Sequence, residues 1–173
     1  MTVFWTVFAG VSVYVVGELL MRFIVDPIHQ QRETVGKVAS FLIYHGNRFT
    51  SPGIPQQLID AGNDEEIRRR KARLEETHEV GRNLATELVV RTQSIPCYSW
   101  LERVGWAPKR AKIAEAQGGL FAITNSLYDI GSGIQNYKRA KAVEQALGIV
   151  TEFRIPETKK PAAAETADPP PNA

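Results

Sequence analysis

Apolar and polar positions divide the chain into a continuous apolar segment, a long amphipathic part and a polar tail. No charged residue occurs between Val3 and Gly17, and the apolar character resumes after Glu18. About 20 helical residues cross the ~30 Å hydrocarbon core of a bilayer. The pattern therefore predicts a transmembrane helix within residues 1–25.

Three other interpretations of residues 1–25 fit the sequence less well. A cleavable signal peptide begins with basic residues and ends at a small-residue cleavage site, and the segment has neither feature. A buried core helix is an alternative, although the segment is apolar on every face, as expected for contact with lipid. An interfacial helix needs a strongly polar face, which is missing here. A single span is the favoured interpretation.

The flanking charges predict the orientation of this span. Its N-terminal flank has no basic side chain, whereas Arg22, Arg32 and Lys37 follow its other end. Basic residues collect on the cytoplasmic side of membrane proteins, so the N-terminus is expected outside and residues 27–173 in the cytoplasm. A single cysteine in 173 residues agrees, since small exported domains often carry paired cysteines.

After Asp26-Pro27, a capping residue followed by a proline at the first helical position, apolar residues recur at helical spacing. No stretch alternates with a period of two, so no sheet is expected. We expect helices over 27–49, 64–94, 96–104, 108–127 and 132–147, with Ser132 as the cap of the last. Prolines and a glycine at 51–55 end the first of these helices, and a charged linker follows up to residue 63. The expected core residues are Ile28, Val35, Val38, Leu42, Phe49, Ile67, Leu74, Leu84, Leu88, Ile95, Ile113, Ala116, Leu120, Ile123 and Leu127.

These elements predict an all-α fold in three parts. The N-terminal transmembrane helix (1–25) is followed by an antiparallel helical bundle (26–150), which is long enough to bury one core. The remaining residues, 151–173, are rich in proline and alanine and lack apolar side chains for a core. We expect this C-terminal tail to be disordered.

Several short motifs in the chain resemble those of a known group of proteins. The most specific are Asp26-Pro27-Ile28, Ile95-Pro96, Asn125-Ser126-Leu127 and Leu147-Gly148-Ile149. In this order they resemble a group of uncharacterised bacterial single-span membrane proteins, over roughly residues 15–149. The resemblance implies a location in the bacterial inner membrane and no particular activity or cofactor. It also implies a packing role for Cys97, because that position is usually apolar or aromatic in the group.

The sequence contains no recognisable catalytic, cofactor or metal motif. His29, His45 and His78 lack the spacing of a helical metal site, so surface or capping roles are expected. The glycine pair Gly118-Gly119 lacks the lysine and strand of a phosphate loop and is expected to permit close helix packing. No cofactor is therefore expected.

Two small groups of polar residues are candidate sites. Asn125, Ser126 and Asp129 lie together where an apolar helix ends and could line a small-ligand pocket, although capping and turn hydrogen bonds explain them as well. Glu18 and Arg22 are four residues apart at the cytoplasmic boundary of the span. We expect them to form a membrane-boundary ion pair.

The one notable charge cluster is the basic run 68–71 with Arg73. It could bind nucleic acid or anionic lipid headgroups, but acidic residues bracket the run and the net charge is only +2, which favours a solvated helix face. Two functions then remain. The first is a membrane-tethered module that binds a protein partner or another copy of itself. The alternative is a small membrane enzyme or transporter accessory protein with a polar ligand site near Asn125.

Overall fold

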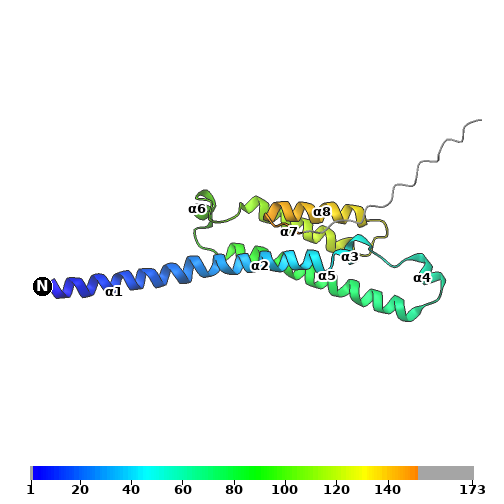
Figure 1. Cartoon of the computed structure of the whole chain (residues 1–173), viewed down its shortest axis with the longest axis horizontal. Helices are drawn as coiled ribbons and strands as arrows, with labels where there is room; N and C mark the ends of the chain where they lie inside the picture. Colours follow the sequence, from blue (N-terminus) through cyan, green and yellow to red (C-terminus); the bar gives the residue numbers. More distant parts are fainter. Residues whose placement is uncertain (1, 152–173) are drawn as a thin grey trace, which may run out of the picture.

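The computed structural model describes residues 2–151, so the tail predicted to be disordered lies, from residue 152 onward, outside the described residues. The described part is helical and contains no strand, which confirms the all-α prediction (Figure 1). Its helices are α1 (Thr2–Leu20), η1 (Met21–Val25), α2 (Asp26–Tyr44), α3 (Gly46–Thr50), α4 (Gln56–Asp60), α5 (Asp64–Gln93), α6 (Tyr98–Arg103), α7 (Arg110–Asn125) and α8 (Gly133–Leu147).

The first three elements form one long helix, whose α1 end projects from the rest of the molecule (Figure 1). The predicted boundary at Asp26 coincides with the change from π-helix to α-helix, but the prediction that Asp26 caps a helix is wrong, because its own backbone is helical. The segment η1 is a π-helix in which the Asp26 N–H donates to the Met21 carbonyl, five residues earlier. A widened turn of this kind relieves the clash that the Pro27 ring would otherwise make with the preceding turn. The helix therefore continues through the proline.

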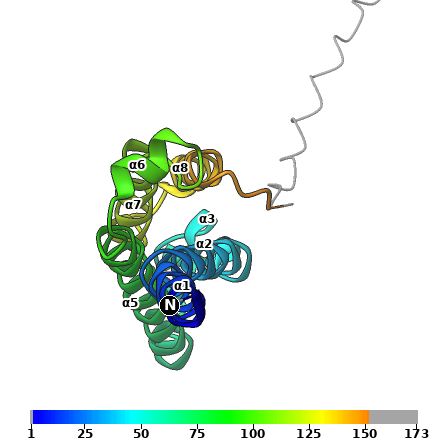
Figure 2. The ribbon, with the colours of Figure 1, turned by 90° about the vertical axis from the view of Figure 1, so that its left-hand side faces the viewer.

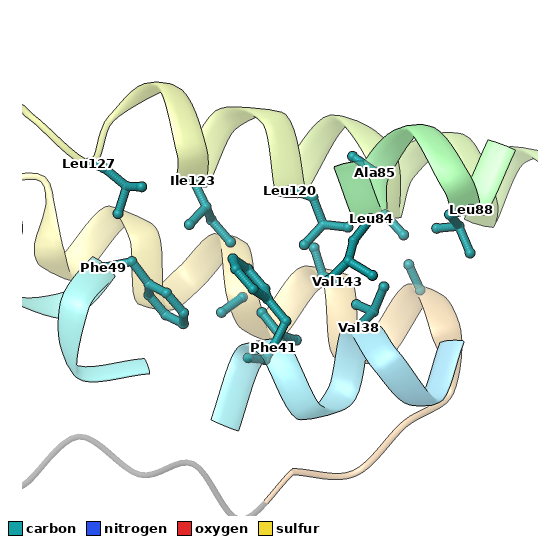
Figure 3. Packing of buried hydrophobic residues seen from close by; sticks show 14 of the residues in the cluster. Val38, Phe41, Phe49, Leu84, Ala85, Leu88, Leu120, Ile123, Leu127 and Val143 are labelled. Carbon is teal, nitrogen blue, oxygen red and sulfur yellow. The ribbon is translucent and has the colours of Figure 1, made fainter. Parts of the chain in front are cut away.

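Helices α2, α5, α7 and α8 lie side by side and share one apolar core (Figure 2). Figure 3 shows Phe41 of α2 in the middle of this core, facing residues of α7 and α8. Of the predicted core positions, Ile28, Val35 and Ile67 are half-buried and the others are buried. The buried members are Val38, Leu42, Phe49, Leu74, Leu84, Leu88, Ile95, Ile113, Ala116, Leu120, Ile123 and Leu127.

Several glycines, Gly119 and Gly133 among them, allow helices to approach closely. A Cβ at Gly119 would lie 2.5 Å from Cγ2 of Val143, whereas one at Gly118 would meet nothing within 4 Å. Close packing at the glycine pair is therefore confirmed for Gly119 alone. A Cβ at Gly133 would overlap the backbone carbonyl of Thr50, so the start of α8 packs directly against the end of α3.

Three predicted details differ from the structure. The helix expected over 27–49 ends at Tyr44, because the chain turns at His45 and restarts as α3, which directs Phe49 into the core. The predicted linker contains the short helix α4. Ser132 does precede α8, but its hydroxyl lies within hydrogen-bond distance of the Ser126 and Asp129 carbonyls and does not cap the helix.

A second, smaller apolar cluster surrounds α6. We call residues 95–108 the α6 knob. Its buried side chains are Ile95, Tyr98, Leu101 and Ala107, and Ile24 and Ile28 of the long helix pack against them. The α6 knob is thus attached beside the junction of η1 and α2, at the end of the molecule from which α1 projects (Figure 1).

Candidate functional site

The polar residues predicted at the end of α7 separate into two environments. Ser126 is buried, and its Oγ lies within hydrogen-bond distance of the Ala122 and Ile123 carbonyls and of Oδ1 of Asn136, and accepts from Arg139. Asn125 and Asp129 are exposed. The structure therefore does not gather the three side chains into one pocket.

Asn136, which sequence reasoning missed, is the centre of the buried network around Ser126. Its amide nitrogen donates to the Phe49 carbonyl at 3.1 Å, and its Oδ1 accepts from Arg139 at 3.0 Å. The Arg139 guanidinium also donates to the Ala122 carbonyl. Because these bonds join α3, α7 and α8, the network has a structural role. Its signal in the sequence was the spacing of Asn136 from Ala140 and Val143 on the buried face of α8.

His45 is also buried, so the expected surface role is wrong, although the residue does occupy the C-cap of α2. Its Nδ1 lies 3.0 Å from the hydroxyl of Thr77, and its ring packs against Phe41. Burial lowers the pKa of His45, and the nearby Arg48 guanidinium adds to this effect. Arg48 donates to Thr77 and pairs with Glu76 at 2.7 Å. The hydrogen bonds of His45 and Arg48 therefore connect α2 and α3 to α5.

The other predicted positions have mixed outcomes. Cys97 is exposed and has a positive φ of 52°, so the expected packing role is wrong. It fails because the chain reverses there between α5 and α6, which turns the side chain outward. The described ion pairs include none between Glu18 and Arg22, and that pairing stays a prediction.

The basic run on α5 is largely a solvated face with ion pairs, as expected. Arg69 pairs with Glu65 and Arg73 with Glu66. Arg70 is different, because its guanidinium donates to the backbone carbonyls of Gly53 and Ser51. It therefore holds the segment between α3 and α4 against α5.

That segment forms one wall of an open groove at the end of the molecule farthest from α1, which we call the distal groove (Figure 1). Its volume is about 600 Å³, and its lining includes Thr50–Pro52, Pro55–Gln57, Arg70, Ile130, Gly131, Gly133 and Ile134. Ile130 and Ile134 are 69% and 70% exposed. Large apolar side chains gathered around a surface groove are typical of protein-binding sites.

A second cavity lies between α2 and the α6 knob. It has a volume of about 350 Å³ and is lined by Ile28, Gln31, Arg32, Val35, residues 105–108 and Leu147. Gln31 is buried at its floor and donates to Thr92 and to the hydroxyl of Tyr98, which in turn donates to the Pro108 carbonyl at 2.6 Å. These bonds fasten the α6 knob to α2 and α5.

Neither cavity offers recognisable catalytic chemistry. Within residues 2–151, no group of three or more His, Cys, Asp or Glu side chains is placed to hold a metal ion. The resemblance to single-span membrane proteins also stays a prediction. No family model, curated protein or solved structure matches the chain.

Proposed function

We propose that this chain is a single-pass membrane protein whose helices, packed as an antiparallel bundle, hold a protein partner at the distal groove. In this proposal α1 spans the bacterial inner membrane with its N-terminus outside, and the helical domain lies in the cytoplasm. The observation that carries the proposal is the single continuous helix of α1, η1 and α2. One half of it is apolar and exposed, while the other half contributes to the core.

The exposure of α1 favours a span over a core helix. Its large apolar side chains are exposed, and none of its most apolar window is buried. An exposed apolar helix of this length is unfavourable in water and favourable in lipid. A signal peptide is less consistent with the structure, because Ile24 packs against the α6 knob and the helix continues into α2.

The distal groove is the surface best placed to meet a cytoplasmic partner. The 19 residues of α2 extend about 30 Å at 1.5 Å per residue, so the groove stands roughly that far from the end of the span. The alternative small-ligand site near Asn125 has less support, since the Ser126 hydroxyl is engaged in internal hydrogen bonds.

A photo-crosslinking residue at Ile134 tests the groove in living cells. We expect it to give a reproducible covalent adduct with a protein, because an exposed apolar side chain at a docking groove becomes buried by the partner. The same residue at Val90, which is exposed on α5 outside the groove, is the matched control and should give no such adduct. Adducts of equal intensity at both positions, or at neither, would contradict the proposal. An adduct of twice the chain mass would identify the partner as a second copy.

A reporter fused to Ala173 tests the orientation. Arg22, Arg32 and Lys37 follow the apolar segment, and no basic residue precedes it, so the C-terminus should remain in the cytoplasm. Alkaline phosphatase at this position should be inactive, and a fluorescent protein that folds only in the cytoplasm should be bright. Full phosphatase activity would show that the domain is exported.

A further inference from the structure

The α6 knob carries an exposed pair of tryptophans. Trp100 and Trp106 are 54% and 62% exposed, and their rings meet edge to face with centroids 6.3 Å apart. Val104 lies between them in the sequence and is also exposed. The knob has its own buried side chains in Tyr98 and Leu101, so the tryptophans are not needed for its core.

The position of Trp106 depends on the way α6 ends. Gly105 has a φ of 79°, a left-handed conformation that glycine adopts without strain. The Trp106 N–H donates to the Leu101 carbonyl at 2.9 Å, and the Gly105 N–H donates to the Glu102 carbonyl at 3.3 Å. This pair of bonds is a Schellman motif, which reverses the chain and brings Trp106 back beside Trp100.

The knob lies level with the end of the apolar segment. From Val3 to Ile24 the helix rises about 30 Å, which is the thickness of the hydrocarbon core. Ile24 and Ile28 both pack against the knob. Viewed along the molecule from the N-terminal side, the knob covers the near ends of α7 and α8 (Figure 2). If α1 spans a bilayer, the knob is therefore at the depth of the lipid headgroups on the side where α1 emerges.

The charges around the tryptophans fit the same environment. Arg103, Lys109 and Arg110 are exposed in or directly after the knob, while Glu102 is its one acidic residue. The Arg110 guanidinium also covers one face of the Tyr98 ring at 5.0 Å. Tryptophan is enriched where headgroups meet acyl chains, and basic side chains next to it interact with lipid phosphates.

We propose that the α6 knob is a membrane-interface anchor, with Trp100 and Trp106 seated among the headgroups of the bilayer that α1 spans. The proposal rests on the transmembrane placement of α1. It gives the domain a second attachment beside the span, so that the bundle is held upright on the membrane surface. Lipid therefore covers the exposed tryptophans, rather than another protein or a second copy of this chain.

The experiment uses the full chain in vesicles whose lipids carry bromine, a contact quencher of tryptophan fluorescence, at defined depths. The chain has three tryptophans. Trp5→Phe leaves only Trp100 and Trp106 as emitters, whereas Trp100→Phe combined with Trp106→Phe leaves only Trp5. We expect the emission of Trp100 and Trp106 to lie at shorter wavelength than that of a tryptophan exposed to water. It should be quenched more by bromines near the headgroups than by bromines at the bilayer centre.

A third variant supplies the matched control. Ile134→Trp, made in a chain in which all three natural tryptophans are phenylalanine, places one exposed tryptophan at the distal groove. Its fluorescence should be insensitive to bromine. Equal quenching of this variant and of the knob would indicate that the whole domain adsorbs to lipid, and would overturn the anchor.

The remaining outcomes separate the anchor from the span. If Trp5 is quenched and the knob is not, the anchor is overturned while the span stands. If neither is quenched, the span fails and the anchor fails with it. A knob emission at short wavelength that no bromine quenches would mean that protein covers the tryptophans, which also overturns the anchor. Circular dichroism of each variant should match that of the natural chain.

Discussion

Leu120→Ala is expected to lower the free energy of unfolding by about 2–5 kcal/mol, the range measured when a buried leucine leaves a cavity. Leu120 is completely buried on α7, in the core shared with α2, α5 and α8. Leu88→Ala on α5 should have an effect of the same size, because that side chain is equally buried. Unfolding of the full chain in mild detergent, followed by circular dichroism, measures both.

Val90→Ala is the matched control for the two leucines. Val90 is exposed on the same helix as Leu88, so its truncation should change the free energy of unfolding by no more than about 0.5 kcal/mol. Losses that small in both leucine variants would show that the helices do not share this core.

Asn136→Ala is expected to lower the free energy of unfolding by about 2–4 kcal/mol, through lost buried hydrogen bonds. The change removes the donor to the Phe49 carbonyl and the Oδ1 that accepts from Ser126 and Arg139. All of these contacts lie at the junction of α3, α7 and α8. Denaturant unfolding measures the loss, and the native helix content should be retained before the transition.

Two variants check that the effect comes from the hydrogen bonds. Asn83→Ala removes an exposed asparagine from α5 and should change the stability by less than about 0.5 kcal/mol. Asn136→Asp replaces the amide donor by a carboxylate oxygen that faces the Phe49 carbonyl, so it should also lower the stability even though the Oδ1 acceptor beside the Arg139 guanidinium is kept. If Asn136→Ala left the free energy of unfolding unchanged, the network would not stabilise the fold.

The helices could be predicted because their signals are local. Apolar spacing located α5 and α7 to within two residues, and Gly105 marked the end of α6 correctly. The break at His45 was missed because it depends on a contact with Thr77, which is distant in the sequence. Continuation of the helix through Pro27 was missed for a different reason, since a π turn has no reliable sequence signal.

The candidate sites were less predictable than the helices. Ser126 was recognised as a polar residue at a helix end, but its partner Asn136 belongs to a different helix. The distal groove and the tryptophan pair of the α6 knob arise only when separate segments meet in space. Sequence spacing within one helix does not carry that information, which is why neither surface was predicted.

The uninterrupted helix from α1 to α2 has a mechanical consequence. If α1 spans a bilayer, no flexible linker separates the span from the domain, and any tilt of α1 is transmitted directly to the domain. Membrane helices tilt by about 20° on average, and thicker or thinner bilayers change that angle. Over a lever arm of about 30 Å, such a tilt displaces the distal groove sideways by roughly 10 Å. The thickness of the surrounding lipid would then set where a bound partner is held.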